Sequence, residues 1–382
     1  MPIKVRKKVK VLLTAGGTGG HMYPVLAVGD WLREIGAGEI TVFYAGQRRG
    51  FEDEFEDRYM STYYIFPSKL RRYFSLKNLL DIPMFLISML QALFWVFHVM
   101  PDVVFSKGGP GTLAVVLAAK FYRIPIVIHE SDAIPSVTNK ISSKFALRIG
   151  VSFQSTLQEF PKEKSFFSGN PLRESMMKNW VDQFSAKMYF KLRAEDPLVL
   201  VLGGSQGSLR INNFILDSLL PLLERAQIMH QVGKQNFKDA VNLSEITLRE
   251  SSDEFRKRYL LRDYLSAKDM RIALNAADVV IARAGSGIHE LALFGKPTIL
   301  IPLAESANDH QKANAYEYAQ TGAAIVIEED NLKPHVVLSE IEKILSKEEK
   351  SNQMTKAAFS FAKKDASEIV GKEVLGVVGI EL

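Results

Sequence analysis

Two glycine-rich loops in this chain have the composition of phosphate-binding loops. The first follows an apolar run at residues 9–15 and reads GGTGGH over residues 16–21; the second follows residues 198–202 and reads GGSQG over residues 203–207. Glycine lets the backbone turn sharply and lets a phosphate approach N–H groups at a helix N-terminus. Because the two loops lie about one domain length apart, they predict two similar α/β units that face one phosphate-bearing ligand.

A third glycine loop carries side chains that could bind a nucleotide. It lies in the segment ARAGSGIHE, residues 282–290, between an apolar run and a helical pattern. Backbone N–H groups at Ser286 and Gly287 could bind a diphosphate, as in the first two loops. Glu290 would lie in the first helical turn, where the helix dipole favours a carboxylate that accepts a ribose hydroxyl, although an ordinary first-turn carboxylate is an equally good explanation.

A polar helix start further along the chain could bind a sugar. The segment DHQKAN covers residues 309–314 and begins a helical pattern. Gln311 and Asn314 are three residues apart, so they lie on one helix face and could bind sugar hydroxyls. Taken alone, these two residues are also typical of a solvated helix start.

The sequence lacks three motifs of other nucleotide-binding enzymes. It contains no Asp-x-Asp pair to hold a metal on a nucleotide diphosphate, and no Gly-x-x-x-x-Gly-Lys-Ser/Thr loop of a kinase or ATPase. The first loop lacks the G-x-G-x-x-G spacing, and no acidic residue ends the second predicted strand, so a dehydrogenase is disfavoured. We therefore expect no metal site.

Alternating apolar runs and helical patterns predict two doubly wound α/β domains, because strands that alternate with helices form parallel sheets. Ligands of such sheets bind beyond the carboxyl ends of the strands, where the glycine loops lie. Turn residues at 169–171 interrupt the pattern and predict domains at residues 1–168 and 169–364. The predicted strands are residues 9–15, 40–45, 102–106, 126–129, 199–202, 228–232, 279–282 and 298–302, and the predicted helices are residues 24–35, 113–122, 289–294, 309–321 and a helix from residue 212.

Composition and charge narrow the class of protein. The 382 residues are 47% hydrophobic and 24% charged, as in ordinary globular proteins. The absence of cysteine excludes a disulfide framework and a cysteine nucleophile, and it fits a reducing cytosol. No signal peptide is expected, since residues 9–15 read as a buried strand. The formal charge of +5 is compatible with an anionic partner and equally with a mildly basic soluble protein, and the lack of a recognised binding module or aromatic stacking motif disfavours nucleic acid.

The segment LLDIPMFLISMLQALFWVFHVM, residues 79–100, is apolar around nearly its whole circumference. It is consistent with a transmembrane helix, with a fully buried core helix, or with a helix that has one face on the sheet and the other in a membrane surface. Four polar or helix-breaking residues interrupt the run and a predicted strand follows it, which disfavours a transmembrane helix. The basic residues at 69–77 favour the third structure, in which Phe94 and Trp95 contact an anionic membrane.

Six motifs, spread in order over nearly the whole chain, make it resemble the MurG-type enzymes, the undecaprenyl-diphospho-muramoylpentapeptide β-N-acetylglucosaminyltransferases of peptidoglycan synthesis. Any one motif would be a weak signal, whereas six in the family's order are a specific one. The motifs are GGTGGHMYP at residues 16–24, HESDAIPSVTNK at 129–140, GNPLR at 169–173, GGSQGSLRIN at 203–212, ARAGSGIHEL at 282–291 and DHQKANA at 309–315.

The resemblance implies a GT-B fold, with two Rossmann-like domains around a cleft, and an inverting transfer of N-acetylglucosamine that uses no metal and no cofactor. The donor would be UDP-N-acetylglucosamine, held mainly by the C-terminal domain. The acceptor would be lipid I, whose muramoyl 4-hydroxyl attacks the anomeric carbon to give lipid II. The resemblance further implies a peripheral enzyme of cell-wall biogenesis and cell division at the cytoplasmic face of the membrane. A final helix at about residues 365–382 would pack back on the first domain.

The resemblance also assigns substrate-binding residues. Without a metal, the leaving diphosphate needs backbone N–H groups, helix dipoles and fixed cations. The residues that match donor-binding positions are Arg173, Ser205, Gln206, Ser286, Gly287, Glu290, Gln311 and Asn314, and those of the loop near the donor sugar and acceptor diphosphate are Thr18, Gly19 and Gly20. Asp132 stands where many family members have asparagine beside the donor sugar. The acceptor-side loop at residues 108–112 departs from the family pattern, because it lacks the usual aromatic residue.

An inverting transfer needs a base that takes the proton of the acceptor hydroxyl. His21 is the first candidate, because imidazole titrates near neutrality and its loop is expected to face the cleft. A purely structural role, in which His21 orients the loop, is the alternative. Glu130 and Asp132 are the other candidate bases.

Two other functions stay open on the sequence. A paralogous GT-B transferase with another lipid or natural-product acceptor is favoured by the departure at residues 108–112. A degenerate transferase that serves as a membrane-bound scaffold is disfavoured by the presence of Arg173, Ser205, Glu290 and Gln311.

Overall fold

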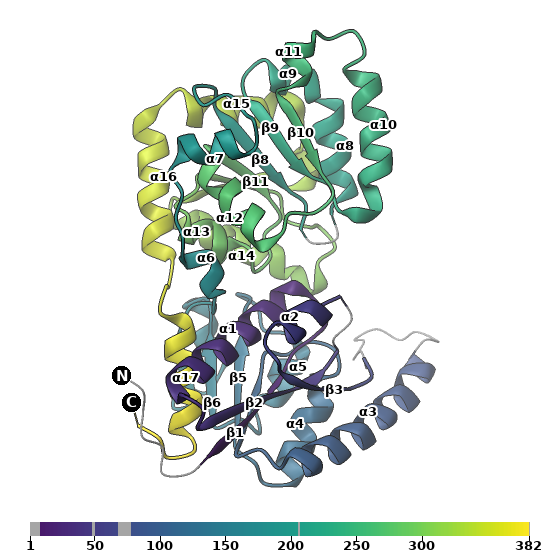
Figure 1. The fold of residues 1–382 in the computed structure, drawn as a ribbon, viewed down its shortest axis with the longest axis vertical. Helices are drawn as coiled ribbons and strands as arrows, with labels where there is room; N and C mark the ends of the chain where they lie inside the picture. Colours follow the sequence, from purple (N-terminus) through teal and green to yellow (C-terminus); the bar gives the residue numbers. More distant parts are fainter. Residues whose placement is uncertain (1–7, 48–49, 68–77, 205–206, 382) are drawn as a thin grey trace. The chain divides into compact units, whose positions relative to one another are not determined.

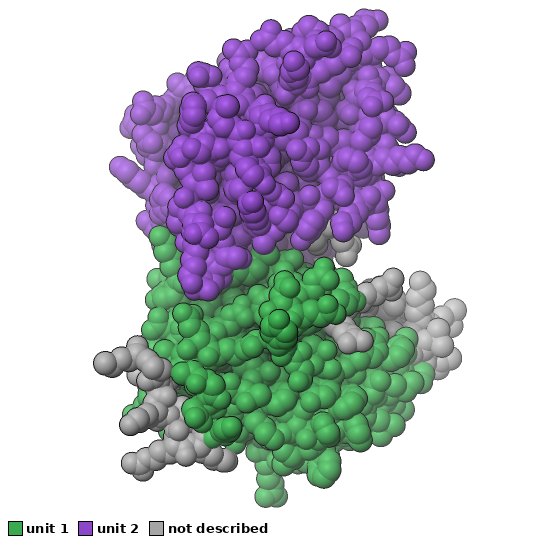
Figure 2. Space-filling model, in the orientation of Figure 1, with its two compact units in different colours: residues 1–173, 363–382 green, residues 174–362 purple. Residues whose placement is uncertain are grey.

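The chain forms two compact units, coloured separately in Figure 2. Unit 1 consists of residues 1–173 and 363–382, and unit 2 of residues 174–362, whereas the sequence predicted a division between residues 168 and 169. The computed structural model describes residues 8–47, 50–67, 78–204 and 207–381.

Unit 1 is built on a seven-stranded parallel sheet with the order β3-β2-β1-β4-β5-β6-β7 (Figure 1). Its strands are β1 (Val9–Thr14), β2 (Ile40–Gly46), β3 (Ser61–Tyr64), β4 (Val103–Ser106), β5 (Ile126–Glu130), β6 (Arg148–Val151) and β7 (Ser165–Phe167), and its helices are α1 (Gly19–Gly36), α2 (Glu52–Glu56), α3 (Asn78–Val99), α4 (Thr112–Phe121), α5 (Val137–Ser142), the 3₁₀ helix η1 (Ser155–Glu159) and α17 (Ala366–Gly376).

Helices cover both faces of this sheet. Successive residues of β1 point to opposite faces, so Val11 and Leu13 pack with α1 and α17, whereas Leu12 packs with α3 and α4. The C-terminal helix α17 lies against α1. A Cβ atom on Gly371 of α17 would lie 2.2 Å from the ring of Trp31, so this helix contact requires glycine.

Unit 2 repeats the architecture with a six-stranded parallel sheet of order β10-β9-β8-β11-β12-β13. Its strands are β8 (Leu198–Leu202), β9 (Gln227–Gln231), β10 (Tyr259–Arg262), β11 (Val279–Ala282), β12 (Thr298–Leu300) and β13 (Ala324–Val326). Its helices are α6 (Glu174–Met177), α7 (Gln183–Tyr189), α8 (Leu209–Asp217), α9 (Leu219–Leu223), α10 (Phe237–Thr247), α11 (Asp253–Arg256), α12 (Ala267–Ala276), α13 (Ile288–Leu293), α14 (His310–Gln320), α15 (Pro334–Leu345) and α16 (Glu348–Phe361), with 3₁₀ helices η2 (Lys234–Asn236), η3 (Ala307–Asp309) and η4 (Glu329–Asn331).

Both sheets reverse their strand order beside the first strand, which lies between β2 and β4 in unit 1 and between β9 and β11 in unit 2. In unit 1 the loops at this switch point meet, because the N–H of Gly16 donates to the carbonyl of Gly108 over 2.8 Å. In unit 2 the N–H of Arg283 donates to the carbonyl of Leu202 over 3.4 Å. The glycine loops therefore lie where open α/β sheets bind their ligands.

Helix α3 has a buried stripe and an exposed apolar face. The fully buried core helix, one of the three structures considered for residues 79–100, is therefore wrong. Ala92 and Val96 belong to the core, whereas Leu86, Leu90 and Phe94 are 58%, 68% and 60% exposed. Within the described residues, this is the one helix long and apolar enough to cross a membrane: residues 82–99 have a mean hydropathy of 1.8 and are 22% buried.

The expectation for the flank of α3 is tested only in part. Trp95, expected beside Phe94 in the lipid-facing surface, is half-buried and stacks on Tyr63 with ring centroids 4.7 Å apart. The basic residues Lys69, Arg71, Arg72 and Lys77 lie outside the described residues.

Candidate active site

The first glycine loop in unit 1 leads directly into helix α1. The sequence predicted a helix from residue 24, but α1 begins at Gly19, so Gly19 and Gly20 form its first turn. The first N–H groups of an α-helix have no carbonyl partner within the helix, which makes this turn suitable for binding an anion. The exposed Thr18 precedes the helix, and its Oγ1 lies 2.8 Å from Nδ1 of His21. This hydrogen bond orients the imidazole.

The ring of His21 lies beside the loop that follows β4. A Cβ atom on Gly109 would lie 3.5 Å from Cε1 of His21 and 2.8 Å from Cα of Gly16. Gly109 also has φ of +98°, which other residues rarely adopt. Only glycine allows these two loops to approach so closely, and the approach puts His21 next to the predicted acceptor-side segment.

Glu130, a candidate base, is a buried anchor of its own loop. Its carboxylate accepts four hydrogen bonds of 2.8–3.1 Å: from the N–H groups of Ser131 and Asp132 to Oε1, and from the N–H of Ser136 and Nδ2 of Asn139 to Oε2. Burial raises the pKa of Glu130 and the nearby Asp132 carboxylate raises it further, while the bonds from Ser136, Asn139 and Asp132 lower it.

These four donors occupy the places where a proton would be taken up, and the residue is only 3% exposed. The geometry therefore disfavours Glu130 as the catalytic base and gives it a positioning role, which corrects the expectation from sequence. Asp132, the other carboxylate of this loop, is half-buried and holds η1 in place, because its carbonyl accepts the hydroxyl of Thr156 over 3.1 Å.

Arg173, the predicted diphosphate-binding cation, is supported by an aromatic ring of α1. Its guanidinium carbon lies 3.8 Å from the ring centre of Tyr23, a cation–π distance, and the residue is 7% exposed. Tyr23 follows His21 by two residues. Unit 1 therefore places the candidate base and the candidate cation around one turn of α1.

In unit 2 the loop after β8 is pressed against the end of β9. Gly207 has φ of +78°, and a Cβ atom there would lie 2.0 Å from the carbonyl oxygen of Val232, so only glycine fits. Ser208 caps helix α8 by accepting the N–H of Ile211. Ser205 and Gln206, the predicted donor-binding residues of this loop, lie outside the described residues.

Arg283, which sequence reasoning passed over, connects three loops of unit 2. Its Nη2 lies 2.6 Å from Oγ of Ser208 and 2.5 Å from Oε1 of Glu329, and its Nη1 donates to the carbonyl of Ile301 over 3.0 Å. The side chains of Arg283 and Glu329 are 11% and 7% exposed. The guanidinium thus holds together the start of α8, the end of β12 and η4. The sequence signal for this role is an arginine directly after a buried strand. The partners of Arg283 lie far along the chain, however, so the sequence does not identify them.

The loop after β11 and the start of α14 contain the other predicted donor-binding residues. Ser286 and Glu290 are half-buried, and Gly287 is exposed at the start of α13, with Glu290 in its first turn as predicted. The half-buried Gln311 accepts the N–H of Leu303 through Oε1 over 3.1 Å. These residues surround the same end of the sheet.

Asn314 does not share the surface position of Gln311. It is 0% exposed, and its Nδ2 donates to the carbonyl of Ala284 over 3.1 Å. The predicted contact of Asn314 with a sugar hydroxyl is therefore not supported. The side chain instead fixes the loop that carries Ser286 and Gly287.

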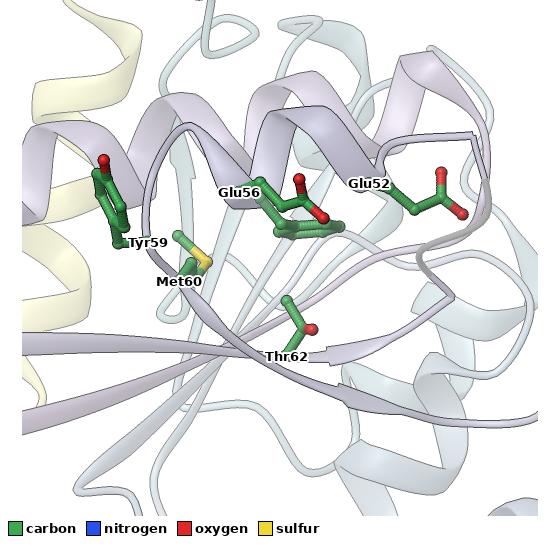
Figure 3. Close-up of a pocket in the computed structure, with 6 residues that line it drawn as sticks. Glu52, Glu56, Tyr59, Met60 and Thr62 are labelled. Atoms are coloured by element: carbon green, nitrogen blue, oxygen red, sulfur yellow. The ribbon is translucent and has the colours of Figure 1, made fainter.

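A pocket of about 330 Å³ lies elsewhere in unit 1, on α2 and β3 (Figure 3). Figure 3 shows Glu52 and Glu56 along helix α2, with Met60 on the segment that leads into β3 and Thr62 in β3. None of its lining residues belongs to the six motifs. Among the described residues, no group of three histidine, aspartate or glutamate side chains is placed to hold a metal ion.

Comparison with known families matches both halves of the chain. The model of the glycosyltransferase family 28 N-terminal domain matches residues 11–151, and that of the family 28 C-terminal domain matches residues 198–370. Curated UDP-N-acetylglucosamine–N-acetylmuramyl-(pentapeptide) pyrophosphoryl-undecaprenol N-acetylglucosamine transferases are similar over most of their length. The transferase from Clostridium kluyveri is 33% identical, and the match covers 91% of this chain and 95% of the relative. The transferase from Clostridium botulinum is 31% identical, and the match covers 95% of this chain and 99% of the relative.

Solved structures support the same fold. The MurG of Acinetobacter baumannii has a TM-score of 0.71 at 24% identity and covers 96% of this chain and 99% of its own. The UDP-GlcNAc 2-epimerase of Neisseria meningitidis bound to UDP-GlcNAc has a TM-score of 0.69 at 14% identity, and the match covers 96% of this chain and 100% of the epimerase. At these identities the likeness shows the GT-B fold.

Proposed function

The chain belongs to glycosyltransferase family 28, and we propose that it transfers N-acetylglucosamine from UDP-N-acetylglucosamine to lipid I, giving lipid II. The observation that carries the proposal is the similarity, over nearly the full chain, to transferases named for this reaction. The positions of the glycine loops at both switch points support it, because these loops could bind the diphosphate groups of both substrates.

Unit 2 would bind the donor. The backbone N–H groups of the loops after β8 and β11 would surround the diphosphate, and Glu290 would accept a ribose hydroxyl. Gln311 would contact the sugar, with Asn314 and Arg283 holding the loops in place. The leaving UDP would be stabilised by these fixed dipoles, which are already oriented before charge develops. The family resemblance assigns the Arg173 guanidinium to the same diphosphate.

Unit 1 would supply the base. The muramoyl 4-hydroxyl oxygen attacks the anomeric carbon from the face opposite UDP, the bond from that carbon to the UDP oxygen breaks, and the hydroxyl proton passes to His21 Nε2. The bond between Thr18 and Nδ1 sets the ring orientation for this role. A neutral imidazole is a suitable general base. Attack opposite the leaving group inverts the anomeric configuration.

The activity is tested with a short-chain lipid I analogue and labelled UDP-N-acetylglucosamine. We expect label in a product that has the mass of the analogue plus one N-acetylhexosamine residue. Parallel reactions contain UDP-glucose and diacylglycerol, the substrates of a paralogous transferase. Transfer to diacylglycerol alone, or the absence of any UDP-N-acetylglucosamine binding by calorimetry, would contradict the proposed function.

We further propose that α3 rests on an anionic membrane surface at the cytoplasmic face. Ile82, Leu86, Leu90 and Phe94 are spaced four residues apart and are 58–68% exposed, so they form one apolar face. The exposed Phe121 of α4 extends the apolar surface through Tyr122 and Phe97, whose rings lie within 5.9 Å. Such a helix can bury its exposed face in the headgroup region while its other face stays on the sheet.

Flotation with vesicles that contain an anionic lipid tests this surface. Two buried large apolar side chains contribute about 1.5–3 kcal/mol each, so the double variant L90N/F94N should lose at least tenfold in vesicle affinity. The matched control is L243N/I246N on α10 of unit 2, whose residues are 48% and 60% exposed. Equal flotation of both double variants, or no flotation of the unaltered protein, would contradict membrane binding through α3.

A further inference from the structure

A buried lysine connects three loops of unit 1. Lys107 directly follows β4 and is 1% exposed. Its Nζ is in hydrogen-bond contact with Nδ1 of His129, in β5, and lies 3.0 Å from Oδ1 of Asn170, beyond β7. One side chain therefore spans the carboxyl ends of the sheet from β4 to the segment that leads to Arg173.

The direction of these hydrogen bonds follows from the partners of His129. Its Nε2 lies 3.0 Å from the carbonyl oxygen of Gly169, which can only accept, and 3.0 Å from Oγ of Ser168, which itself donates to that carbonyl over 2.8 Å. Both partners then accept, so Nε2 carries a hydrogen. In the neutral ring Nδ1 is then an acceptor, and Lys107 donates to it. A second N–H of Lys107 donates to Asn170. The result is a directed chain from Lys107 through His129 to the backbone of Gly169.

Both donations need only two N–H groups, which an amine has in its neutral form as well as its charged form. Burial lowers the pKa of Lys107 to about 7, while the carboxylates of Glu130 and Asp132 act in the opposite direction. The links to His129 and Asn170 consequently do not depend on the charge of the lysine.

The three connected loops are the ones that carry or contact the candidate catalytic groups of unit 1. The loop after β4 includes Gly109, which packs against the first glycine loop beside His21. The loop after β5 is organised by Glu130, and the segment after β7 ends at Arg173. A shift of any of these loops would therefore displace either the neighbourhood of the base or the cation.

We propose that Lys107 is a positioning residue for glycosyl transfer, which ties the loops after β4, β5 and β7 into one arrangement of His21 and Arg173. This inference rests on the proposed function. Displacements of about 1 Å by remote changes can lower turnover by about 100-fold. A residue that only stabilised the fold would instead reduce the amount of folded protein without changing kcat per folded molecule.

Four variants test the inference: K107M, which keeps the length of the side chain without a donor; N170A, which keeps Lys107 but removes one acceptor; the double variant; and K144M, which removes an exposed lysine of the same unit as a matched control. We measure kcat and KM with the lipid I analogue, UDP affinity by calorimetry, and folding by circular dichroism. UDP affinity reports on the donor-binding residues, which include Arg173 in the proposed function.

The expected result is a fall in kcat of at least tenfold for K107M and N170A, with no comparable fall for K144M. The double variant should be no worse than the worse single variant, because both changes break the same link. Two results would overturn the inference. One is a kcat of K107M and N170A within twofold of that of K144M. The other is a fall in kcat of the double variant that equals the product of the two single falls. If K107M fails to fold, N170A decides by itself. Absence of transfer by the unaltered protein would instead refute the proposed function.

Discussion

Removing the carboxylate of Glu329 should destabilise unit 2 and weaken UDP binding. Glu329 in η4 is the acidic partner of Arg283, whose guanidinium also contacts Ser208 and the carbonyl of Ile301. In E329A the guanidinium keeps its two neutral acceptors but loses its counter-charge. Arginine stays protonated at any pH at which the protein folds, so the charge cannot be relieved by deprotonation.

The structure sets the size of the effect. Both side chains are about nine-tenths buried, and the N–O distance is 2.5 Å. Removing one partner of a buried pair costs about 3–5 kcal/mol, because the remaining charge is left without compensation. In a domain of 150–250 residues, one kcal/mol changes the melting temperature by about 2–4 °C. We therefore expect E329A to melt about 10 °C lower, and E329Q, which keeps an acceptor oxygen, to lose less.

The neighbouring Asp330 provides a matched control in the same 3₁₀ helix. It is 94% exposed and lies 3.9 Å from Arg210, a surface pair that contributes about 0–1 kcal/mol. Denaturant unfolding of E329A, E329Q and D330N gives the free energies, and calorimetry with UDP gives the affinities. The UDP dissociation constant of E329A should rise at least fivefold, since the loops after β8 and β11 lose their common support. A free energy of unfolding for E329A equal to that of D330N would refute this account of Arg283.

H21A should lower kcat by about 10²–10⁴-fold, the usual contribution of a general base, with UDP affinity unchanged and with T18A losing less; retention of most of kcat would exclude His21 as the base. G371A should destabilise the protein by about 1–3 kcal/mol, because its Cβ would lie 2.2 Å from Trp31, whereas G376A on the same helix meets no atom within 4 Å and should be neutral or stabilising in the same denaturant titration. Stability should rise between about pH 7 and pH 10.5, because folded Lys107 loses its proton at about 7 and the unfolded lysine keeps it, so the cost of the buried charge is present below pH 7 and relieved above. This rise in the free energy of unfolding amounts to at most about 1.4 kcal/mol per pH unit, and K107M should remove it. An unchanged pH dependence of unfolding in K107M would contradict this prediction.

The sequence predicted the centres of both sheets well and their edges poorly. Strands β1, β4 and β5 lie where apolar runs were found, and β11 has the predicted bounds of 279–282. Such strands are buried on both faces and read as continuous apolar runs. The strands that were missed, β3, β6, β7, β10 and β13, lie at or next to sheet edges, and most are half-buried with polar or glycine residues. Their pairing depends on neighbours far along the chain, which a local pattern does not contain.

The candidate site shows a similar division. The glycine loops were recognisable because their function depends on backbone conformation, which glycine reports directly. The roles of Glu130 and Asn314 were not recognisable from the sequence, since a carboxylate or amide within a motif can face either a ligand or a set of backbone groups. Only the path of the loop decides between these two. Arg283 and Lys107 were missed for a further reason: Ser208 is 75 residues from Arg283, and Asn170 is 63 residues from Lys107.

Lys107 and Arg283 occupy equivalent positions in the two units. Each is the first residue after the strand that borders the switch point, β4 in unit 1 and β11 in unit 2, and each donates its N–H to the last residue of the neighbouring first strand, over 2.9 and 3.4 Å. Each side chain then turns inward and holds the adjacent loops.

Lys107 and Arg283 differ, however, in whether their contacts depend on charge. Lys107 binds neutral acceptors that need only two N–H groups, so its links survive deprotonation. Arg283 is permanently charged and paired with a carboxylate, so its buried charge depends on the presence of Glu329. Removal of this carboxylate in E329A should therefore loosen the loops of unit 2 while the links of Lys107 in unit 1 persist. UDP affinity should consequently fall more in E329A than in K107M, and E329Q, which keeps an acceptor oxygen for Arg283, should lose less UDP affinity than E329A.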